Sequence, residues 1–240
     1  MIEFYYAPTP NGWKIAIMLE ETGLAYETRL MRLSAGEQFA PEFLRLSPNA
    51  RMPAILDRDP PPTYGPEPVG VFESGAILLY LAEKTGRFAP PEADRRARKE
   101  LSEWLFWQVG NQGPMGGQLS HFVNYAPAGQ DYGQARYLGE YERTLAVLER
   151  RLEGRDYILG AEYSIADMIA FPWAFIAKPL GSSLDPFPRV AEWRARIKER
   201  SAVRRAIDLH KDAQNRGPDM QTAETNTLLY NQSARHILER

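Results

Sequence analysis

The sequence contains no cysteine in its 240 residues. This absence excludes disulfide bonds, thiolate metal sites and a thiol nucleophile carried by the protein itself. Only three histidines are present, His121, His210 and His236, and no two of them have the spacing of metal ligands. We therefore expect no metal site built on histidine.

Charge and hydropathy exclude further classes. The formal net charge is −2 and the pI is near 6.0, which gives no electrostatic argument for a nucleic-acid partner. No stretch approaches the roughly 20 apolar residues of a membrane span, and the first residues lack the basic region of a secretion signal. We expect a cytoplasmic protein that binds neither nucleic acid nor membrane.

The first 86 residues alternate between strand and helix patterns. Strand–helix–strand at the start predicts a parallel pair of strands, and the complete order is that of a thioredoxin-like domain. The predicted strands cover residues 2–6, 26–33, 51–57 and 69–72, and the predicted helices cover 11–21, 41–46 and 75–85.

After Gly86 the pattern is helical only. A capping box at residues 164–167 precedes an apolar helix that must be buried. We predict domains at 1–86 and 87–212 and a tail at 213–240. The predicted helices are one from Pro90 that glycines interrupt at 110–117, and others at 131–152, 168–177, 190–200 and 202–212.

The first predicted helix begins where an open sheet places its ligand. Thr9 before Pro10 is typical of a helix start, so Asn11 and Gly12 stand at a helix N-terminus just past the carboxyl end of a strand. Such a position favours an anion. The segment is not a phosphate loop, and a thiolate or carboxylate fits better than a nucleotide.

Three stretches give the chain a family resemblance. Residues 47–55, 72–81 and 164–167 resemble motifs of the glutathione S-transferase superfamily. Residues 7–12, together with 104–110 and 113–115, are most similar to its bacterial nu class and fungal relatives, which include the globular domain of the yeast nitrogen-regulator prion.

The resemblance implies an α/β thioredoxin-like N-terminal domain plus an all-α helical C-terminal domain. It implies a homodimer that reduces disulfide bonds with glutathione, as thiol or disulfide, and uses no metal and no protein cysteine. Two alternatives stay open: a conventional transferase that conjugates glutathione to electrophiles, and a non-catalytic glutathione-binding or regulatory module.

The resemblance assigns most of the glutathione contacts to two motifs. Pro53 would be a cis proline that turns the Met52 backbone toward the cysteinyl part of glutathione, although Met52 is otherwise read as core filler. Ser74 would hold the γ-glutamyl carboxylate and Glu73 the neighbouring ammonium. Ser74 would also serve as an ordinary helix cap.

Further polar residues have less distinctive settings. Gln38 and Asn49 resemble family contacts to glutathione, and Arg51 either faces the glycyl carboxylate or is solvated. Arg136 resembles a nu-class arginine near the bound sulfurs, although a lone arginine on a charged helix is also typical of a solvated face.

Thr9 and Asn11 are the predicted catalytic residues, because their side chains and the helix N-terminus would stabilise the glutathione thiolate. Lowering a thiol pKa of about 8.5 by two units takes about 2.7 kcal/mol. A helix dipole supplies about 0.3–2 kcal/mol and a hydrogen bond to the anion about 1.5–3 kcal/mol. Tyr5, late in the first strand, is the rival donor, although aromatic residues in buried strands usually belong to the core.

Overall fold

The computed structural model describes residues 1–213 and residue 229. Contacts divide the chain into two compact units, each described here by itself. The N-terminal unit is Met1–Thr85 with residues 205–213 among those described, and the helical unit is Gly86–Arg204. The predicted tail at 213–240 lies almost wholly outside the described residues.

A mixed four-stranded sheet forms the centre of the N-terminal unit. The spatial order is β2-β1-β3-β4, with β1 and β2 parallel, as predicted, and β3 antiparallel to both of its neighbours. The strands are β1 (Ile2–Tyr6), β2 (Tyr26–Leu30), β3 (Ala54–Asp57) and β4 (Val69–Phe72).

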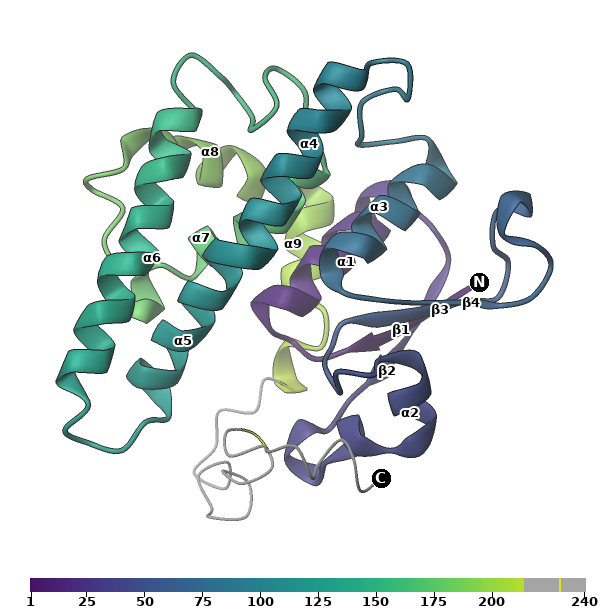
Figure 1. Ribbon diagram of the computed structural model, residues 1–240, viewed down its shortest axis with the longest axis horizontal. Helices are drawn as coiled ribbons and strands as arrows, with labels where there is room; N and C mark the ends of the chain where they lie inside the picture. Colours follow the sequence, from purple (N-terminus) through teal and green to yellow (C-terminus); the bar gives the residue numbers. More distant parts are fainter. Residues whose placement is uncertain (214–228, 230–240) are drawn as a thin grey trace. The chain divides into compact units, whose positions relative to one another are not determined.

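Helices cover both faces of this sheet. Helices α1 (Pro10–Thr22) and α3 (Ser74–Thr85) lie on one side, and α2 (Pro41–Leu46) lies on the other (Figure 1). Helix α1 begins with the predicted Thr9 cap and ends at Gly23 in the left-handed conformation. These local signals place α1 against the sheet, where its residues from Gly12 to Leu19 are all buried.

Two predicted strands are shorter than expected. The strand predicted at 26–33 ends at Leu30, and a 3-10 turn (Leu33–Ala35) follows. The strand predicted at 51–57 begins only at Ala54, because Pro53 has no N–H for a sheet ladder. The loop after β3 contains one further 3-10 turn, Pro62–Tyr64.

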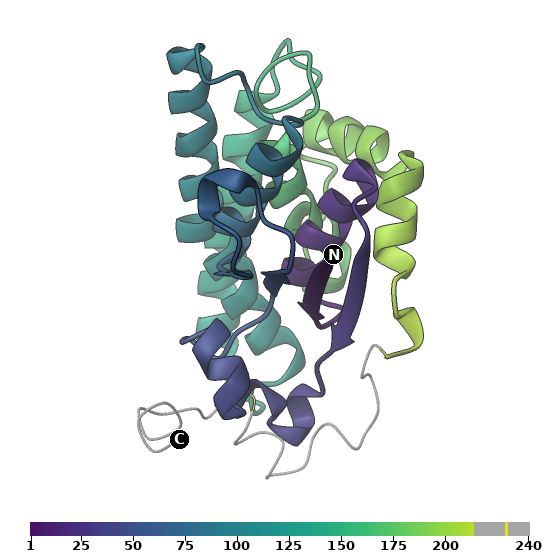
Figure 2. The ribbon, with the colours of Figure 1, turned by 90° about the vertical axis from the view of Figure 1, so that its right-hand side faces the viewer.

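The helical unit departs from the sequence pattern at its first helix. Helix α4 (Arg95–Trp107) continues through a π-helical turn (Gln108–Gln112) into α5 (Gly113–Asn124), and the three form one rod (Figures 1 and 2). The predicted interruption at 110–117 is therefore wrong. A proline in the first turn of a helix is tolerated, and Gly116 lies so close to Trp173 that a Cβ would sit 2.5 Å from its ring.

The remaining helices agree with the pattern within a few residues. They are α6 (Asp131–Arg151), α7 (Ile165–Phe175), α8 (Pro188–Lys198) and α9 (Ser201–Asp208). Residues 205–213 make contacts within the N-terminal unit: Arg205 pairs with Glu20 at 2.6 Å, and the Leu209 carbonyl accepts from Tyr6. The predicted domains, residues 1–86 and 87–212, remain a prediction.

Asp167 organises the core of the helical unit. The predicted capping box is present, with Ser164 as the cap of α7. The fully buried Asp167 carboxylate also accepts from the Ile158 N–H at 2.8 Å and the Trp193 indole N–H at 2.9 Å. Burial raises the pKa of Asp167 to about 6, against the lowering effect of these hydrogen bonds.

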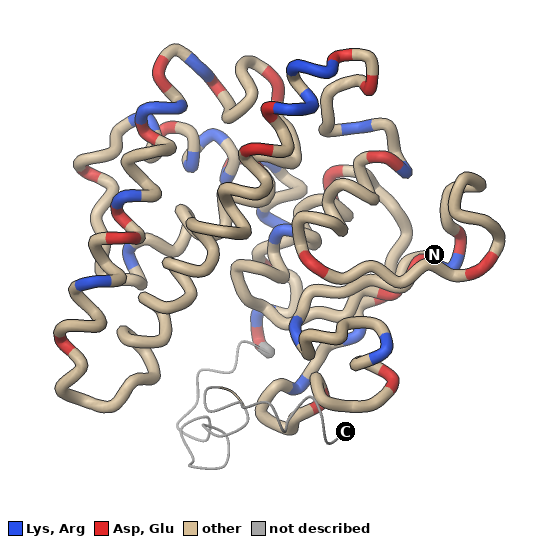
Figure 3. The backbone as a smooth tube through the Cα atoms, in the orientation of Figure 1, with Lys and Arg blue, Asp and Glu red and all other residues tan. Residues whose placement is uncertain are grey.

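No helix in the described part of the chain is both long enough and apolar enough to cross a membrane. Charged residues of both signs are interspersed along most of the backbone, whereas α5 has no Lys, Arg, Asp or Glu (Figure 3).

Replacing Asp167 with alanine leaves four buried donor groups without their acceptor: the N–H groups of Ile158 and Ser164, the Ser164 hydroxyl and the Trp193 indole N–H. We expect Asp167→Ala to lower the free energy of unfolding by about 3–5 kcal/mol, measured by urea denaturation at pH 7.5. Asp156→Ala is the control, because its carboxylate is exposed and pairs with Arg196 at the surface; its loss should be at most about 1 kcal/mol. Equal stability of the two variants would contradict this role of Asp167.

Candidate functional site

The strand register brings three polar segments to one edge of the N-terminal sheet. Ala54, at the start of β3, lies opposite Tyr5 of β1 on one side and Phe72 of β4 on the other. Because β3 is antiparallel to both strands, the segment before β3 lies beside the segments that follow β1 and β4. These segments contain the predicted catalytic residues and both predicted glutathione motifs.

The first segment is the start of α1. Thr9 has an extended backbone, and its hydroxyl accepts from the Gly12 N–H at 3.3 Å. The same hydroxyl has only a long contact of 3.4 Å with the Ala7 carbonyl as an acceptor for its hydrogen. Thr9 therefore caps the helix, as predicted, and its O–H can still turn toward an anion at the helix end.

Gly12 lets this turn close on the sheet. A Cβ at this position would lie 2.2 Å from the Ala7 carbonyl oxygen and 2.8 Å from the Tyr6 ring. No larger residue fits without moving the backbone, so the close approach of α1 to β1 requires glycine here. Thr9 and Asn11, both partly exposed, are held at the sheet edge by this contact.

The second segment precedes β3. Its Met52–Pro53 peptide bond is cis, as the resemblance implies. The buried Ser47 hydroxyl donates to the Arg51 carbonyl at 2.9 Å and accepts from the Arg51 N–H at 3.4 Å, which fixes the preceding loop. Asn49 and Arg51 are exposed on this loop and Met52 is partly exposed.

The third segment joins β4 to α3. Glu73 is exposed and has a positive φ of 67°, and the buried Ser74 is the first residue of α3. Ser74 Oγ accepts a hydrogen bond from Lys14 Nζ at 3.2 Å. Lys14 is buried, and desolvation lowers its pKa from 10.5 to about 7, although the Glu73 charge acts in the opposite direction. An acid, a hydroxyl and a buried amine thus meet at one helix start.

Lys14 is the feature that the sequence pattern does not single out. It lies in the first half of a helix whose pattern is apolar on most faces, where a lone lysine is easily taken for a solvated residue. The available signal is its setting between Trp13 and Ile15, both of which are buried.

Tyr5 lies on a different side of the sheet from α1. Its ring packs against Phe43 of α2, with centroids 5.5 Å apart. Burial raises the pKa of Tyr5, and the negative charge of Glu3 raises it further. Tyr6 points the other way, toward Gly12, and its hydroxyl donates to the Leu209 carbonyl at 3.2 Å. The role of Tyr5 as the rival thiolate donor stays a prediction.

Gln38 is more deeply buried than its predicted role suggests. It lies in a 3-10 turn, Glu37–Phe39, and only 2% of its surface is exposed. Its Oε1 atom has no hydrogen-bond partner among the described residues. The role of Gln38 as a glutathione contact stays a prediction.

Arg136 belongs to the helical unit. It is exposed on α6, with the Glu140 carboxylate 3.6 Å away. It lines an open cleft of about 330 Å³ whose walls are largely aromatic, with glycines where rings approach the backbone: Phe122, Gly129, Gln130, Tyr132, Gly133, Arg136 and Tyr137. The cleft combines stacking surfaces with one cation.

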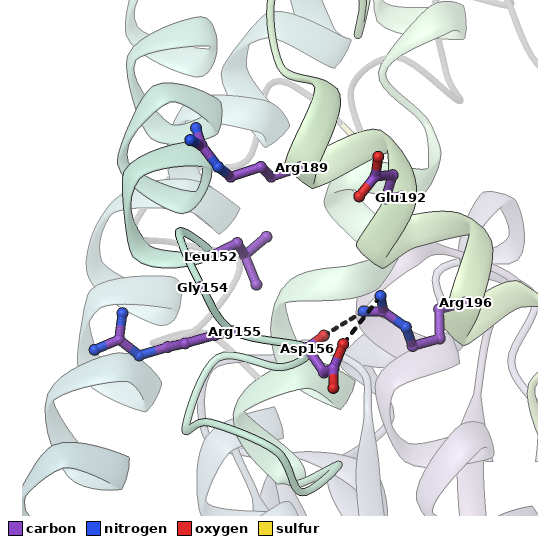
Figure 4. A pocket seen from close by; sticks show the side chains of 7 residues that line it. All are labelled: Leu152, Gly154, Arg155, Asp156, Arg189, Glu192 and Arg196. Carbon is purple, nitrogen blue, oxygen red and sulfur yellow. Dashed lines mark hydrogen bonds and ion pairs between the residues drawn. The ribbon is translucent and has the colours of Figure 1, made fainter.

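A second cleft in this unit, of about 320 Å³, is lined mainly by charged side chains: Leu152, Gly154, Arg155, Asp156, Arg189, Glu192 and Arg196 (Figure 4). Two of its arginines form ion pairs, since Arg196 binds Asp156 at 3.2 Å and Arg189 binds Glu149 at 3.1 Å. These ion pairs connect α8 to α6 and to the loop that follows α6. None of the predicted site residues lies here.

No cluster of three or more His, Asp or Glu side chains suited to a metal ion occurs in the described residues.

Comparison with known proteins identifies the family. The model described as glutathione S-transferase, N-terminal domain, matches residues 2–83, and the corresponding C-terminal domain model matches residues 131–196. Disulfide-bond oxidoreductase YfcG of Escherichia coli is 47% identical over 207 residues, which are 86% of this chain and 94% of that protein. The chain belongs to the glutathione S-transferase family.

Solved glutathione transferases have the same fold. One from Burkholderia graminis, with two glutathione molecules bound per subunit, superposes with a TM-score of 0.81 at 44% identity and covers 90% of this chain and 89% of its own. One from Pseudomonas putida, with one glutathione disulfide bound per subunit, gives a TM-score of 0.78 at 39% identity, covering 87% and 91%.

The predicted fold class of this glutathione S-transferase is therefore confirmed: a thioredoxin-like N-terminal part followed by an all-helical part. The family resemblance is confirmed with it. YfcG is named a disulfide-bond oxidoreductase, which is the activity that the resemblance to the nu class implies. The individual roles of the site residues remain proposals.

Lys14 makes the stability of this transferase depend on pH. The folded-state pKa is lowered to about 7, so between about pH 7 and pH 10 the unfolded chain holds a proton that the folded chain has lost. Stability therefore rises with pH in this window. We expect the wild type to gain about 1.4 kcal/mol per pH unit there relative to Lys14→Met, which buries no charge.

The measurement is urea unfolding of both proteins from pH 6 to pH 9.5. Below pH 7 the methionine variant should be the more stable, and the gap should close as pH rises. Parallel stability curves would show that Lys14 does not titrate in this range.

Proposed function

We propose that this protein is a glutathione-dependent disulfide-bond reductase. The observation that carries the proposal is its 47% identity to a named disulfide-bond oxidoreductase, in a chain that has no cysteine. A dithiol mechanism within the protein is therefore excluded, and every reacting sulfur comes from glutathione or from the substrate. Related structures that hold two glutathione molecules, or one glutathione disulfide, per subunit support the proposal.

The site at the sheet edge suits the zwitterionic end of glutathione. The Ser74 hydroxyl and the N-terminus of α3 would bind the γ-glutamyl carboxylate, and the exposed Glu73 would bind the neighbouring ammonium. The Met52 backbone, next to the cis Pro53, would pair with the cysteinyl residue like an added strand. These four residues adjoin one sheet edge, which supports a single binding site.

Other polar residues would complete recognition. Asn49 and Arg51, exposed on the loop before β3, would contact the backbone and the glycyl carboxylate of glutathione. Gln38 would contribute through a neighbouring turn. Arg136, which resembles a nu-class arginine near the bound sulfurs, would act on the thiol groups of glutathione.

Thr9 and Asn11 would stabilise the glutathione thiolate. Lowering its pKa by two units takes about 2.7 kcal/mol, and the N-terminus of α1 with one or two hydrogen bonds supplies that much. No cationic side chain is needed. The Thr9 hydroxyl hydrogen, spent only on a long contact with Ala7, can be redirected to the sulfur.

Two exchange steps complete the reaction. The thiolate attacks one sulfur of the substrate disulfide, which forms a mixed disulfide and releases the other substrate sulfur as a thiolate that takes a proton from solvent. A second glutathione thiolate attacks the glutathione sulfur of the mixed disulfide and releases the second substrate thiol. The products are glutathione disulfide and two thiols. The protein contributes positioning and anion stabilisation.

Steady-state reduction of a small model disulfide by glutathione, coupled to glutathione reductase, tests the proposal. We expect Thr9→Ala and Asn11→Ala each to lower kcat/KM about 10- to 150-fold, because each removes a hydrogen bond to the thiolate. Thr63→Ala and Asn124→Ala are matched controls at exposed positions.

A parallel assay with an aryl halide separates reduction from conjugation. Little reduction with strong conjugation would make the protein a conventional transferase. Full reductase turnover in both alanine variants would remove the roles given to Thr9 and Asn11.

The protein would act as a homodimer in the cytoplasm, where glutathione is kept reduced. The sequence from Trp104 to Gln130 contains no Lys, Arg, Asp or Glu, and Phe106 within it is 73% exposed. An exposed, uncharged helical surface of this kind is typical of a subunit interface.

Phe106→Glu should therefore shift the protein toward monomer in light scattering coupled to size-exclusion chromatography, because a charge would be buried on association. Tyr64→Glu, at an exposed aromatic residue outside the uncharged stretch, should leave the oligomeric state unchanged. A wild-type monomer would contradict the dimer.

A further inference from the structure

Lys14 is buried in a place where an apolar residue would be more stable. Only 2% of its surface is exposed, and its neighbours in α1 are buried hydrophobic residues. Burying an ammonium costs free energy that a methionine or leucine would not cost. Packing alone therefore gives no reason for a lysine here, whereas its hydrogen bond to Ser74 does.

The hydrogen bond from Lys14 determines that the Ser74 hydroxyl acts as a donor toward any further partner. An ammonium can only donate, so Ser74 Oγ accepts from Lys14 Nζ at 3.2 Å, and the hydroxyl hydrogen must go to a different acceptor. Among the described residues no atom accepts that hydrogen from Ser74 Oγ. The hydroxyl is thus held as a donor at the first residue of α3, where the helix N-terminus also favours an anion.

The charged residues near Lys14 determine whether a negative ligand would be favoured there. Glu73 is one charged residue that acts on Lys14, and it is exposed. The other charged residues of α1 and α3, such as Glu20 and Glu83, lie toward the opposite helix ends. On β1, Glu3 lies on the face away from α1 and pairs with Arg29 and Arg58, and Tyr6 bonds to Leu209.

We propose that Lys14 is a positioning residue for the γ-glutamyl carboxylate: its ammonium orients the Ser74 hydroxyl toward that carboxylate and supplies the positive charge behind it. This inference rests on the proposed binding of glutathione. It adds to that proposal a coupling between ligand binding and the protonation of Lys14.

The coupling follows from the chemistry of the amine. With its pKa lowered to about 7, Lys14 is partly neutral in the free protein above neutral pH. A bound carboxylate favours the charged form, so binding takes up a proton. A neutral amine can instead accept from Ser74, which turns the hydroxyl away from the ligand, so affinity falls as pH rises.

Isothermal titration calorimetry with S-methylglutathione tests this, because that probe has no titrating thiol. The proteins are the wild type, Lys14→Met, Ser74→Ala, the double variant, and Lys99→Met as a control at an exposed lysine. At pH 6.5 we expect Lys14→Met to bind about tenfold more weakly. The loss of affinity in the double variant should be smaller than the sum of the two single losses, because Lys14 acts in part through Ser74.

At pH 8.5 the difference between the wild type and Lys14→Met should shrink, and comparing the two removes the titration of the ligand itself. Wild-type titrations in buffers of different ionisation enthalpy, which need no variant, should show proton uptake that Lys14→Met lacks.

Binding by the wild type without proton uptake, with Lys14→Met within twofold at both pH values, would overturn the role of Lys14 and leave the proposed function standing. Failure of the wild type to bind the probe at all would overturn the proposed function and this inference with it.

Discussion

The antiparallel pairing of β3 with both β1 and β4 is the constraint on which the site depends. It sets the start of β3 beside the ends of its two neighbours. Two helices, α1 and α3, begin directly after those ends, so two helix N-termini adjoin one sheet edge. Without that register the capping residues would be ordinary turns, and the anion-binding potential of the two helices would not be combined.

The two helix starts would divide the work on one tripeptide. In the proposed complex the start of α3, with a serine and a buried lysine, would hold a fixed charge, the carboxylate. The start of α1, where Thr9 and Asn11 are neutral, would meet the group whose charge changes, the thiolate. This difference is consistent with a site that binds the substrate firmly at one end and lets the reactive sulfur exchange at the other.

Local signals made much of the fold predictable, because caps and turns depend on adjacent residues. The Thr9 cap, the left-handed Gly23 and the Ser164 capping box all follow from short motifs. The glycines at 110–117 could not be interpreted in this way, since Gly116 among them packs closely against Trp173, which is distant in sequence.

The residues of the candidate site that belong to family motifs could be predicted from the sequence, and the others could not. Glu73 and Ser74 follow from the family resemblance, and the cis bond at Pro53 agrees with it. The contact of Lys14 with Ser74 joins residues 60 positions apart and has no local signature. The deep burial of Gln38 likewise depends on tertiary packing that its polar loop does not reveal.

The pKa of the glutathione thiol in the complex is the most direct test of catalysis by helix N-termini without a protein cysteine. The difference in ultraviolet absorbance between the complex and the free protein reports the thiolate, and no protein thiol contributes to it because the chain has no cysteine. A bound thiol that titrates about two units below the free value of about 8.5, and returns toward that value in Thr9→Ala, is the predicted result. A bound thiol with the pKa of free glutathione would contradict it.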